Sequence, residues 1–230
     1  CFGENALDAS VSGINNTAIG KNALTELTSG NNNVAVGREA LKAVTTGTGN
    51  IAIGSQSLLA NTTADSNTAV GHVALTNNTT GAENVAVGRE ALKFNTTASN
   101  NTAIGKSALE ANTTGSENVA IGHLTLDANT TGSDNVAVGK GALGLNTTGN
   151  SNTALGGNAL NLSTTAVSNT AVGFDSLAVN TTGGENVAVG RNAMKNSTTG
   201  NDNTAMGKSA MLNNTEGNNN TAVGMDSLKE

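Results

Sequence analysis

Apolar and polar residues recur along this chain with a period of 17 residues. The clearest unit is Asn-Thr-Ala-Ile-Gly, which first occurs at residues 16–20 and then returns at equal spacing. With its Asn as position 1, position 3 is always Ala, position 4 is Val, Ile, Leu or Met, and position 5 is always Gly. Position 8 is small, and position 9 is Leu or Met. A repeat this short and strict is typical of a solenoid, in which each unit buries its apolar residues only against its neighbours.

The hydrophobic pattern predicts one short strand over positions 1–5, as at residues 16–20 and 84–88, closed by a Gly that can take positive φ where the chain turns. Positions 8 and 9 predict the start of a second strand, and the Thr pair at positions 13 and 14 a third extended stretch. Recurrent Gly and Asn-Thr-Thr segments disfavour a helical repeat. We therefore expect an all-β fold, a parallel β-solenoid (β-roll) with one 17-residue coil every ~4.8 Å.

Both faces of the predicted strand are small or apolar. Positions 2 and 4 share one face, where Thr alternates with Val and Ile, and the Ala at position 3 points to the other. Such a strand is expected in a parallel sheet that is covered on both sides. One face can be the interior of the coil, and the other is expected to contact a partner, most simply another copy of the chain.

The Asn at position 1 predicts a structural ladder, because stacked Asn side chains can hydrogen-bond to the coils above and below. A simple turn residue is the alternative interpretation, and both are structural. The members of this column are Asn16, Asn33, Asn50, Asn67, Asn84, Asn101, Asn118, Asn135, Asn152, Asn169, Asn186, Asn203 and Asn220.

The repeat covers residues 1–230 as a single predicted domain, and its phase places both ends inside a repeat. We therefore expect a segment of a longer array. Lipid modification of Cys1 is the alternative interpretation of the first residue.

Composition and charge exclude several classes of protein. Aromatic residues make up 1% of the chain, so any core is narrow and filled by small aliphatic side chains. The abundant Gly and Asn would suit a disordered tract, but strict periodicity argues against it. The net charge of −6 does not favour nucleic acid or an anionic membrane as partner. No apolar run approaches the ~20 residues of a membrane span, so no membrane insertion is expected within this segment.

The sequence predicts no catalytic residue, no metal site and no cofactor, and hence no enzyme. Catalysis needs different groups that converge in one pocket, whereas an array presents the same residues repeatedly. His72 and His123 share position 6, but three coils separate them, roughly 14 Å at the spacing of stacked strands. These two imidazoles therefore cannot share a metal ion.

Charged side chains fall into columns. All eleven Lys and Arg lie at positions 6 and 10, and the position-17 acids are Glu83, Glu117, Asp134, Glu185 and Asp202. The position-6 cations predict either ion pairs with the acids of a neighbouring subunit or a row that binds an anionic polymer such as a sulfated glycan. This basic row consists of Lys21, Arg38, Arg89, Lys106, Lys140, Arg191 and Lys208.

The run Asn-Val-Ala-Val-Gly at residues 84–88, with its equivalent at 118–122, resembles the head repeats of trimeric autotransporter adhesins. The resemblance implies a left-handed β-roll, a homotrimer, an extracellular location on a cell surface, and adhesion to a host-surface protein, matrix protein or glycan through repeated contacts. The complete unit, which is longer than that of the adhesin heads, also resembles arrays in large bacterial, phage and algal-virus fibre proteins. A fibre on a virion surface is therefore the alternative.

Two further features belong to the Asn-Thr-Thr half of the repeat. Aligned Thr ranks, as at residues 62–63 and 79–80, resemble those of ice-binding solenoids, a lesser alternative function. Seven Asn-Thr-Thr triplets between Asn61 and Asn180 also match the acceptor motif for N-glycosylation.

Overall fold

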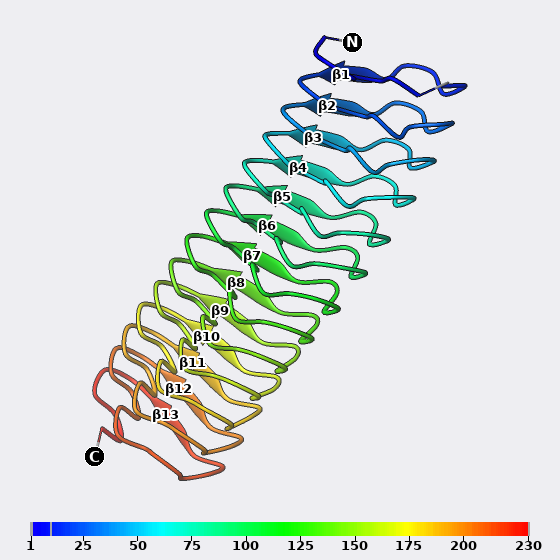
Figure 1. Cartoon of the computed structure of the whole chain (residues 1–230). Helices are drawn as coiled ribbons and strands as arrows, with labels where there is room; N and C mark the ends of the chain where they lie inside the picture. Colours follow the sequence, from blue (N-terminus) through cyan, green and yellow to red (C-terminus); the bar gives the residue numbers. More distant parts are fainter. Residues whose placement is uncertain (1, 10, 230) are drawn as a thin grey trace. The chain divides into compact units, whose positions relative to one another are not determined.

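The computed structural model describes residues 2–9 and 11–229, so Cys1 and the proposal of its lipid modification lie outside the described residues. The chain forms two compact units, Cys1–Ser116 and Glu117–Glu230. In each unit the backbone winds through stacked coils, and each coil contributes one short strand (Figure 1). The prediction of one continuous array over residues 1–230 stays a prediction.

Each strand spans three residues and occupies positions 2–4 of the repeat. The first unit contains β1 (Thr17–Ile19), β2 (Val34–Val36), β3 (Ile51–Ile53), β4 (Thr68–Val70), β5 (Val85–Val87) and β6 (Thr102–Ile104). The second unit contains β7 (Val119–Ile121), β8 (Val136–Val138), β9 (Thr153–Leu155), β10 (Thr170–Val172), β11 (Val187–Val189), β12 (Thr204–Met206) and β13 (Thr221–Val223).

Within each unit, neighbouring strands pair in parallel at an offset of one repeat. Ala35, for example, lies opposite Ala18 on one side and Ala52 on the other. Ala171 of the second unit is placed in the same way between Ala154 and Ala188. The predicted parallel β-solenoid with 17-residue coils is therefore confirmed.

The predicted second strand at positions 8 and 9 is wrong, and the Thr pair at positions 13 and 14, predicted as an extended stretch, forms a bend and no strand. Position 9 adopts left-handed backbone in coil after coil, as at Leu92 with φ of 50°, and position 7 does the same, as at Glu90 with φ of 64°. This conformation prevents an extended segment from forming there. The coils still stack through backbone hydrogen bonds, with Leu92 N donating to Ala108 O at 3.1 Å and Thr79 N to Thr96 O at 2.9 Å.

The interior of the coil lies on the Ala side of the strand. Ala86 at position 3, Ala91 at position 8 and Leu92 at position 9 are all fully buried, whereas Val85 and Val87 point outward and are half-buried. Alanine leaves little distance between the two walls of the coil, so the core is a narrow column of Ala and Leu. Burial of a Leu contributes roughly 1.5–3 kcal/mol, which offsets the roughly 1–2 kcal/mol of left-handed strain at the same residue.

The position-1 asparagines form a hydrogen-bonded ladder inside each unit. Asn50 donates its backbone N–H and its Nδ2 to Oδ1 of Asn33, at 2.9 and 3.2 Å, and Nδ2 also donates to Ala64 O at 2.8 Å. Asn135 of the second unit repeats these contacts with Asn118 and Gly149. Each buried amide therefore joins two coils and closes its own.

Position 12 carries a second ladder, which was not predicted from the sequence. Asn95 Nδ2 donates to Asn78 Oδ1 at 2.8 Å and to Ala98 O at 3.0 Å, and both asparagines are fully buried. In two coils an apolar residue, Leu27 or Val44, replaces the Asn and is equally buried. The replacement of Asn by an aliphatic residue in these coils is visible in the sequence, and it could have indicated that position 12 is buried.

Candidate functional surface

The outward side of the strands is an uncharged, largely aliphatic surface. Positions 2 and 4 contain only Thr, Val, Ile, Leu and Met in the strands of both units, and we call this surface, in each unit by itself, the strand face. Its members are partly accessible: Ile53 is 41% exposed, Ile104 39% and Met206 44%. In a monomer of either unit, adjacent coils therefore present rows of branched aliphatic side chains to solvent.

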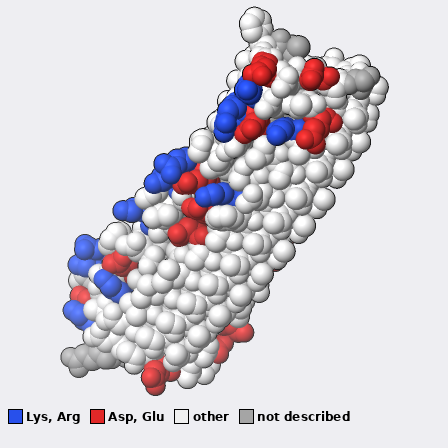
Figure 2. Space-filling model, in the orientation of Figure 1, with Lys and Arg blue, Asp and Glu red and all other residues white. Residues whose placement is uncertain are grey.

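The basic row lies beside one end of the strands, and all seven of its residues are exposed. Lys21 pairs with Glu4 at 2.8 Å, and Arg89 pairs with Glu90 at 3.1 Å. Among the residues that the structure describes, Lys106, Lys140, Arg191 and Lys208 make no ion pair. Figure 2 shows Lys and Arg interspersed with Asp and Glu along one margin of the surface in view.

Acidic neighbours reduce the positive potential around the basic row. Ten of the seventeen Asp and Glu occupy positions 6, 7, 10 or 11 of the repeat, which also contain all eleven Lys and Arg. The hydrogen bond from Gln56, followed by the charge of Arg38, lowers the pKa of Glu39. The hydrogen bond from Arg89 and its charge lower the pKa of Glu90. These glutamates stay ionised at neutral pH, so each offsets the positive charge of the neighbouring arginine.

The other end of the strands has the opposite charge. Positions 14, 16 and 17 contain no Lys or Arg, and we call their acids the acidic edge: Asp65, Glu83, Glu117, Asp134, Glu185, Asp202 and Glu216. All seven are exposed. The strand face is thus bordered by bases at position 6 and by acids at position 17. The proposed ion pairs between these two columns, across subunits, stay a prediction.

The two threonine ranks differ in their surroundings. At position 13 the hydroxyl is half-buried and donates to the carbonyl of the next coil, as from Thr79 Oγ1 to Thr96 O at 3.0 Å. At position 14 the side chain is exposed, as at Thr80 and Thr97. The second rank is therefore the more accessible of the two.

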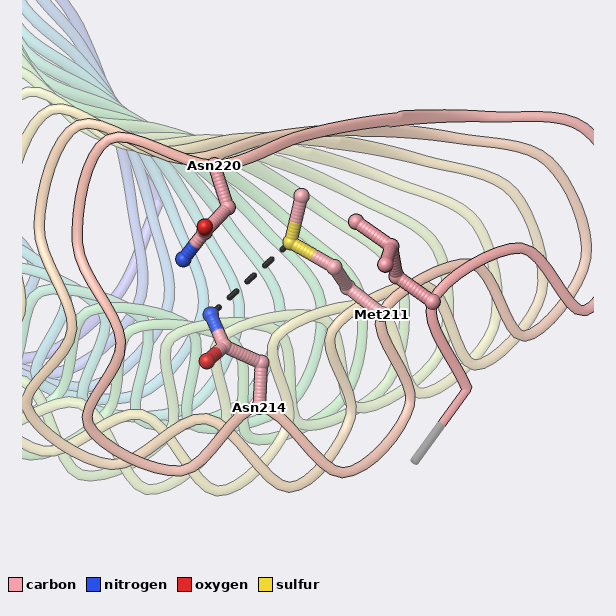
Figure 3. Close-up of a pocket in the computed structure, with 4 residues that line it drawn as sticks. Met211, Asn214 and Asn220 are labelled. Carbon is pink, nitrogen blue, oxygen red and sulfur yellow. Dashed lines mark hydrogen bonds between the residues drawn. The ribbon is translucent and has the colours of Figure 1, made fainter.

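A hollow lies over the last described coil, lined by Met211, Asn214, Asn220 and Leu228. In Figure 3 the side-chain amides of Asn214 and Asn220 point toward one another from opposite sides of the coil, and Asn214 Nδ2 contacts Met211 Sδ at 3.8 Å. These residues belong to positions 9, 12 and 1, which in the preceding coils form the buried core. The hollow is thus lined by residues of the core columns, and none of the four is charged.

Sites for metal chemistry are not formed by the described residues. His72 and His123 are both exposed and belong to different units. Within residues 2–9 and 11–229, no three His, Cys, Asp or Glu side chains gather where they could hold a metal ion. In the same residues no helix is long and apolar enough to cross a membrane.

No protein-family model, no curated protein and no solved structure matches this chain.

Proposed function

We propose that this chain is a structural and adhesive fibre segment that assembles as a homotrimer through its strand face. The observation that carries the proposal is the outward aliphatic surface of β1–β13, which a monomer leaves in water. Contiguous apolar surfaces of this kind mark interaction sites in soluble proteins. Parallel sheets, in addition, occur almost only with both faces covered.

The charge on the two borders of the strand face supports a second copy of the chain as the covering partner. When parallel copies are related by rotation about the solenoid axis, the bases of one copy meet the acids of the next, and the ring closes. A twofold axis perpendicular to the strands' stacking direction would instead bring like charges together. Electrostatic complementarity therefore favours a parallel ring and disfavours an antiparallel dimer.

The proposed role is passive and not enzymatic, because every coil offers nearly the same side chains. Repeated weak contacts to a host-surface protein, matrix protein or glycan would gain strength from their number. The location that suits this role is extracellular, on a cell surface. A phage or virus fibre on a virion surface is the alternative, and flanking sequence separates the two: a membrane-anchor barrel favours the adhesin, and a virion-attachment or chaperone domain the viral fibre.

The assembly is tested with a pair of matched variants. Ile53→Glu with Ile104→Glu adds two charges to the strand face, whereas Thr63→Glu with Thr114→Glu adds them to exposed position-14 sites of the same two coils. We expect a trimer for the wild type and the Thr variant and a folded monomer for the Ile variant. Light scattering gives the mass, and far-ultraviolet circular dichroism shows whether β structure is retained. A wild-type chain that is a stable, folded monomer would refute the proposal.

The exposed position-14 threonines support ice binding as a second candidate. They occupy consecutive coils in each unit, as at Thr80 and Thr97, and their side chains are exposed. Thermal hysteresis of the purified chain tests this function, and Thr80→Asp with Thr97→Asp would abolish it. Absence of hysteresis in the wild type eliminates this candidate.

A further inference from the structure

The seven Asn-Thr-Thr glycosylation motifs all place their acceptor Asn at position 12, inside the coil. Each of these asparagines is 0% exposed. They are Asn61, Asn78, Asn95, Asn112, Asn129, Asn146 and Asn180.

The nitrogen that would receive the glycan, Nδ2 of the acceptor Asn, already donates a hydrogen bond within the fold in each motif. Asn112 Nδ2 donates to Gly115 O at 2.8 Å and to Asn95 Oδ1 at 2.9 Å, and Asn180 Nδ2 donates to Gly183 O at 2.8 Å. Both hydrogens of Nδ2 therefore hold the coil together in Asn112. The same bond to the carbonyl three residues later occurs at Asn61, at 3.1 Å.

N-glycosylation would consume this atom. The Nδ2 nitrogen bonds to C1 of the first sugar and loses a proton, while the C1–oxygen bond to the polyprenyl diphosphate carrier breaks. One N–H remains, so one of the two hydrogen bonds is lost, and a hydrophilic sugar is fixed to an atom in a close-packed interior. A glycan at position 12 and a closed coil therefore exclude each other.

Other motifs remain open in the folded chain. Asn77, at position 11, begins Asn77-Asn78-Thr79, and Asn100, at position 17, begins Asn100-Asn101-Thr102. Both asparagines are exposed. Motifs that differ little in sequence thus differ in exposure: the fold buries the acceptor Asn at position 12 and leaves Asn77 and Asn100 exposed.

We infer that folding and N-glycosylation compete for the position-12 asparagines, and that the chain folds where no oligosaccharyltransferase acts on nascent polypeptides. The inference concerns the single chain, so it stands or falls independently of trimer formation and adhesion. It excludes biogenesis by co-translational transport through a glycosylating secretory pathway.

The test expresses the wild-type chain with a cleavable signal sequence in the secretory pathway of cultured eukaryotic cells, with and without tunicamycin, which blocks synthesis of the lipid-linked oligosaccharide. With active transfer we expect mass increments from glycans at position 12 and loss of protease-resistant protein. Tunicamycin should remove the increments and restore resistance. Peptide mass spectrometry identifies the modified asparagines.

A matched variant removes the motifs and keeps the asparagines. Thr→Ala at residues 63, 80, 97, 114, 131, 148 and 182 changes only exposed position-14 side chains. This variant should be protease-resistant even without tunicamycin. The control, Asn77→Gln with Thr102→Val, removes two open motifs and should not restore resistance; Val already occupies position 2 in other coils, such as Val85.

A second experiment uses only the wild-type chain, so that the inference can be tested even if the sevenfold variant does not fold. Wild-type chain purified from a cytosol without glycosylation is incubated with a soluble oligosaccharyltransferase and its donor, before and after denaturation. We expect transfer to Asn77 and Asn100 but not to position 12 in the folded chain, and transfer to position 12 only after denaturation. Glycans at position 12 of a protease-resistant chain, from either experiment, would overturn the inference.

Discussion

Asn84 donates both its backbone N–H and its Nδ2 to Oδ1 of Asn67, at 3.0 and 3.1 Å, and its own Oδ1 accepts the same two bonds from the next coil. Asn84→Ala removes these side-chain contacts, including the Oδ1 that accepts from the buried backbone N–H and Nδ2 of Asn101. We expect a loss of about 1–3 kcal/mol in the free energy of unfolding. Urea denaturation measures it, with the exposed Asn77→Ala as the control that should change little.

Gly173 shows why position 5 is invariant. Its φ is 132°, and a Cβ built on it would lie 2.6 Å from Gly190 O in the next coil. Gly173→Ala should cost more than about 2 kcal/mol, since backbone strain and overpacking add. Gly157→Ala is the matched control, because its φ is not in the left-handed region and its Cβ would meet only the Phe174 ring at 3.3 Å. Equal thermal stability of the two variants would contradict this account.

The 17-residue period made the coil and the register predictable, because an unbroken repeat leaves one way to align Ala18 with Ala35. The inward face of the strand was not predictable from the pattern. Both Ala and the Val or Ile beside it are apolar, and only the narrowness of the closed coil places Ala inside. The backbone conformation at position 9 could not be predicted either, since Leu seldom adopts the positive φ found at Leu92.

The candidate surface was only partly readable from sequence. The columns of bases and acids follow from spacing, but the pairing of Arg89 with Glu90 does not, because it depends on the turn at positions 6 and 7. The burial of Asn78 was hidden for a different reason: Asn-Thr-Thr is also a common turn sequence. Its bond to Asn61 Oδ1, in the preceding coil, exists only once the two coils have stacked.

Position 7 offers a stabilising substitution. Val73 has φ of 52° and Leu124 has φ of 51°, at a position where other coils carry Asn, such as Asn22. Asn tolerates left-handed backbone much better than a β-branched residue does. We expect Val73→Asn to raise the free energy of unfolding by about 0.5–1 kcal/mol, measured by thermal denaturation. A decrease would show that the Val side chain contributes more than its strain costs.

The position-12 ladder of the second unit is interrupted by serines. Asn146 Oδ1 and Ser163 Oγ are buried and have no hydrogen-bond partner among the described residues. Ser163→Asn would supply an Nδ2 donor to Asn146 Oδ1, as in the other coils. We expect stabilisation of about 1 kcal/mol. Ser163→Ala, which removes an unpaired hydroxyl without adding a donor, should have a smaller effect. A destabilised Asn variant would mean that the space at this coil does not admit the amide.

The basic row gives the last prediction, because it separates inter-subunit ion pairs from a binding site. Arg89→Gln with Lys106→Gln should weaken assembly modestly and leave the fold intact, since each exposed pair is worth about 0.2–1 kcal/mol. The control, Lys42→Gln with Lys93→Gln, removes the same charge from position 10, away from the strand border. Sedimentation at low and high salt measures the change, and salt should narrow the difference between wild type and the first variant. If that variant assembles like the wild type but loses salt-sensitive binding to heparin-like polymers, the row binds an anionic ligand and does not pair with the acidic edge.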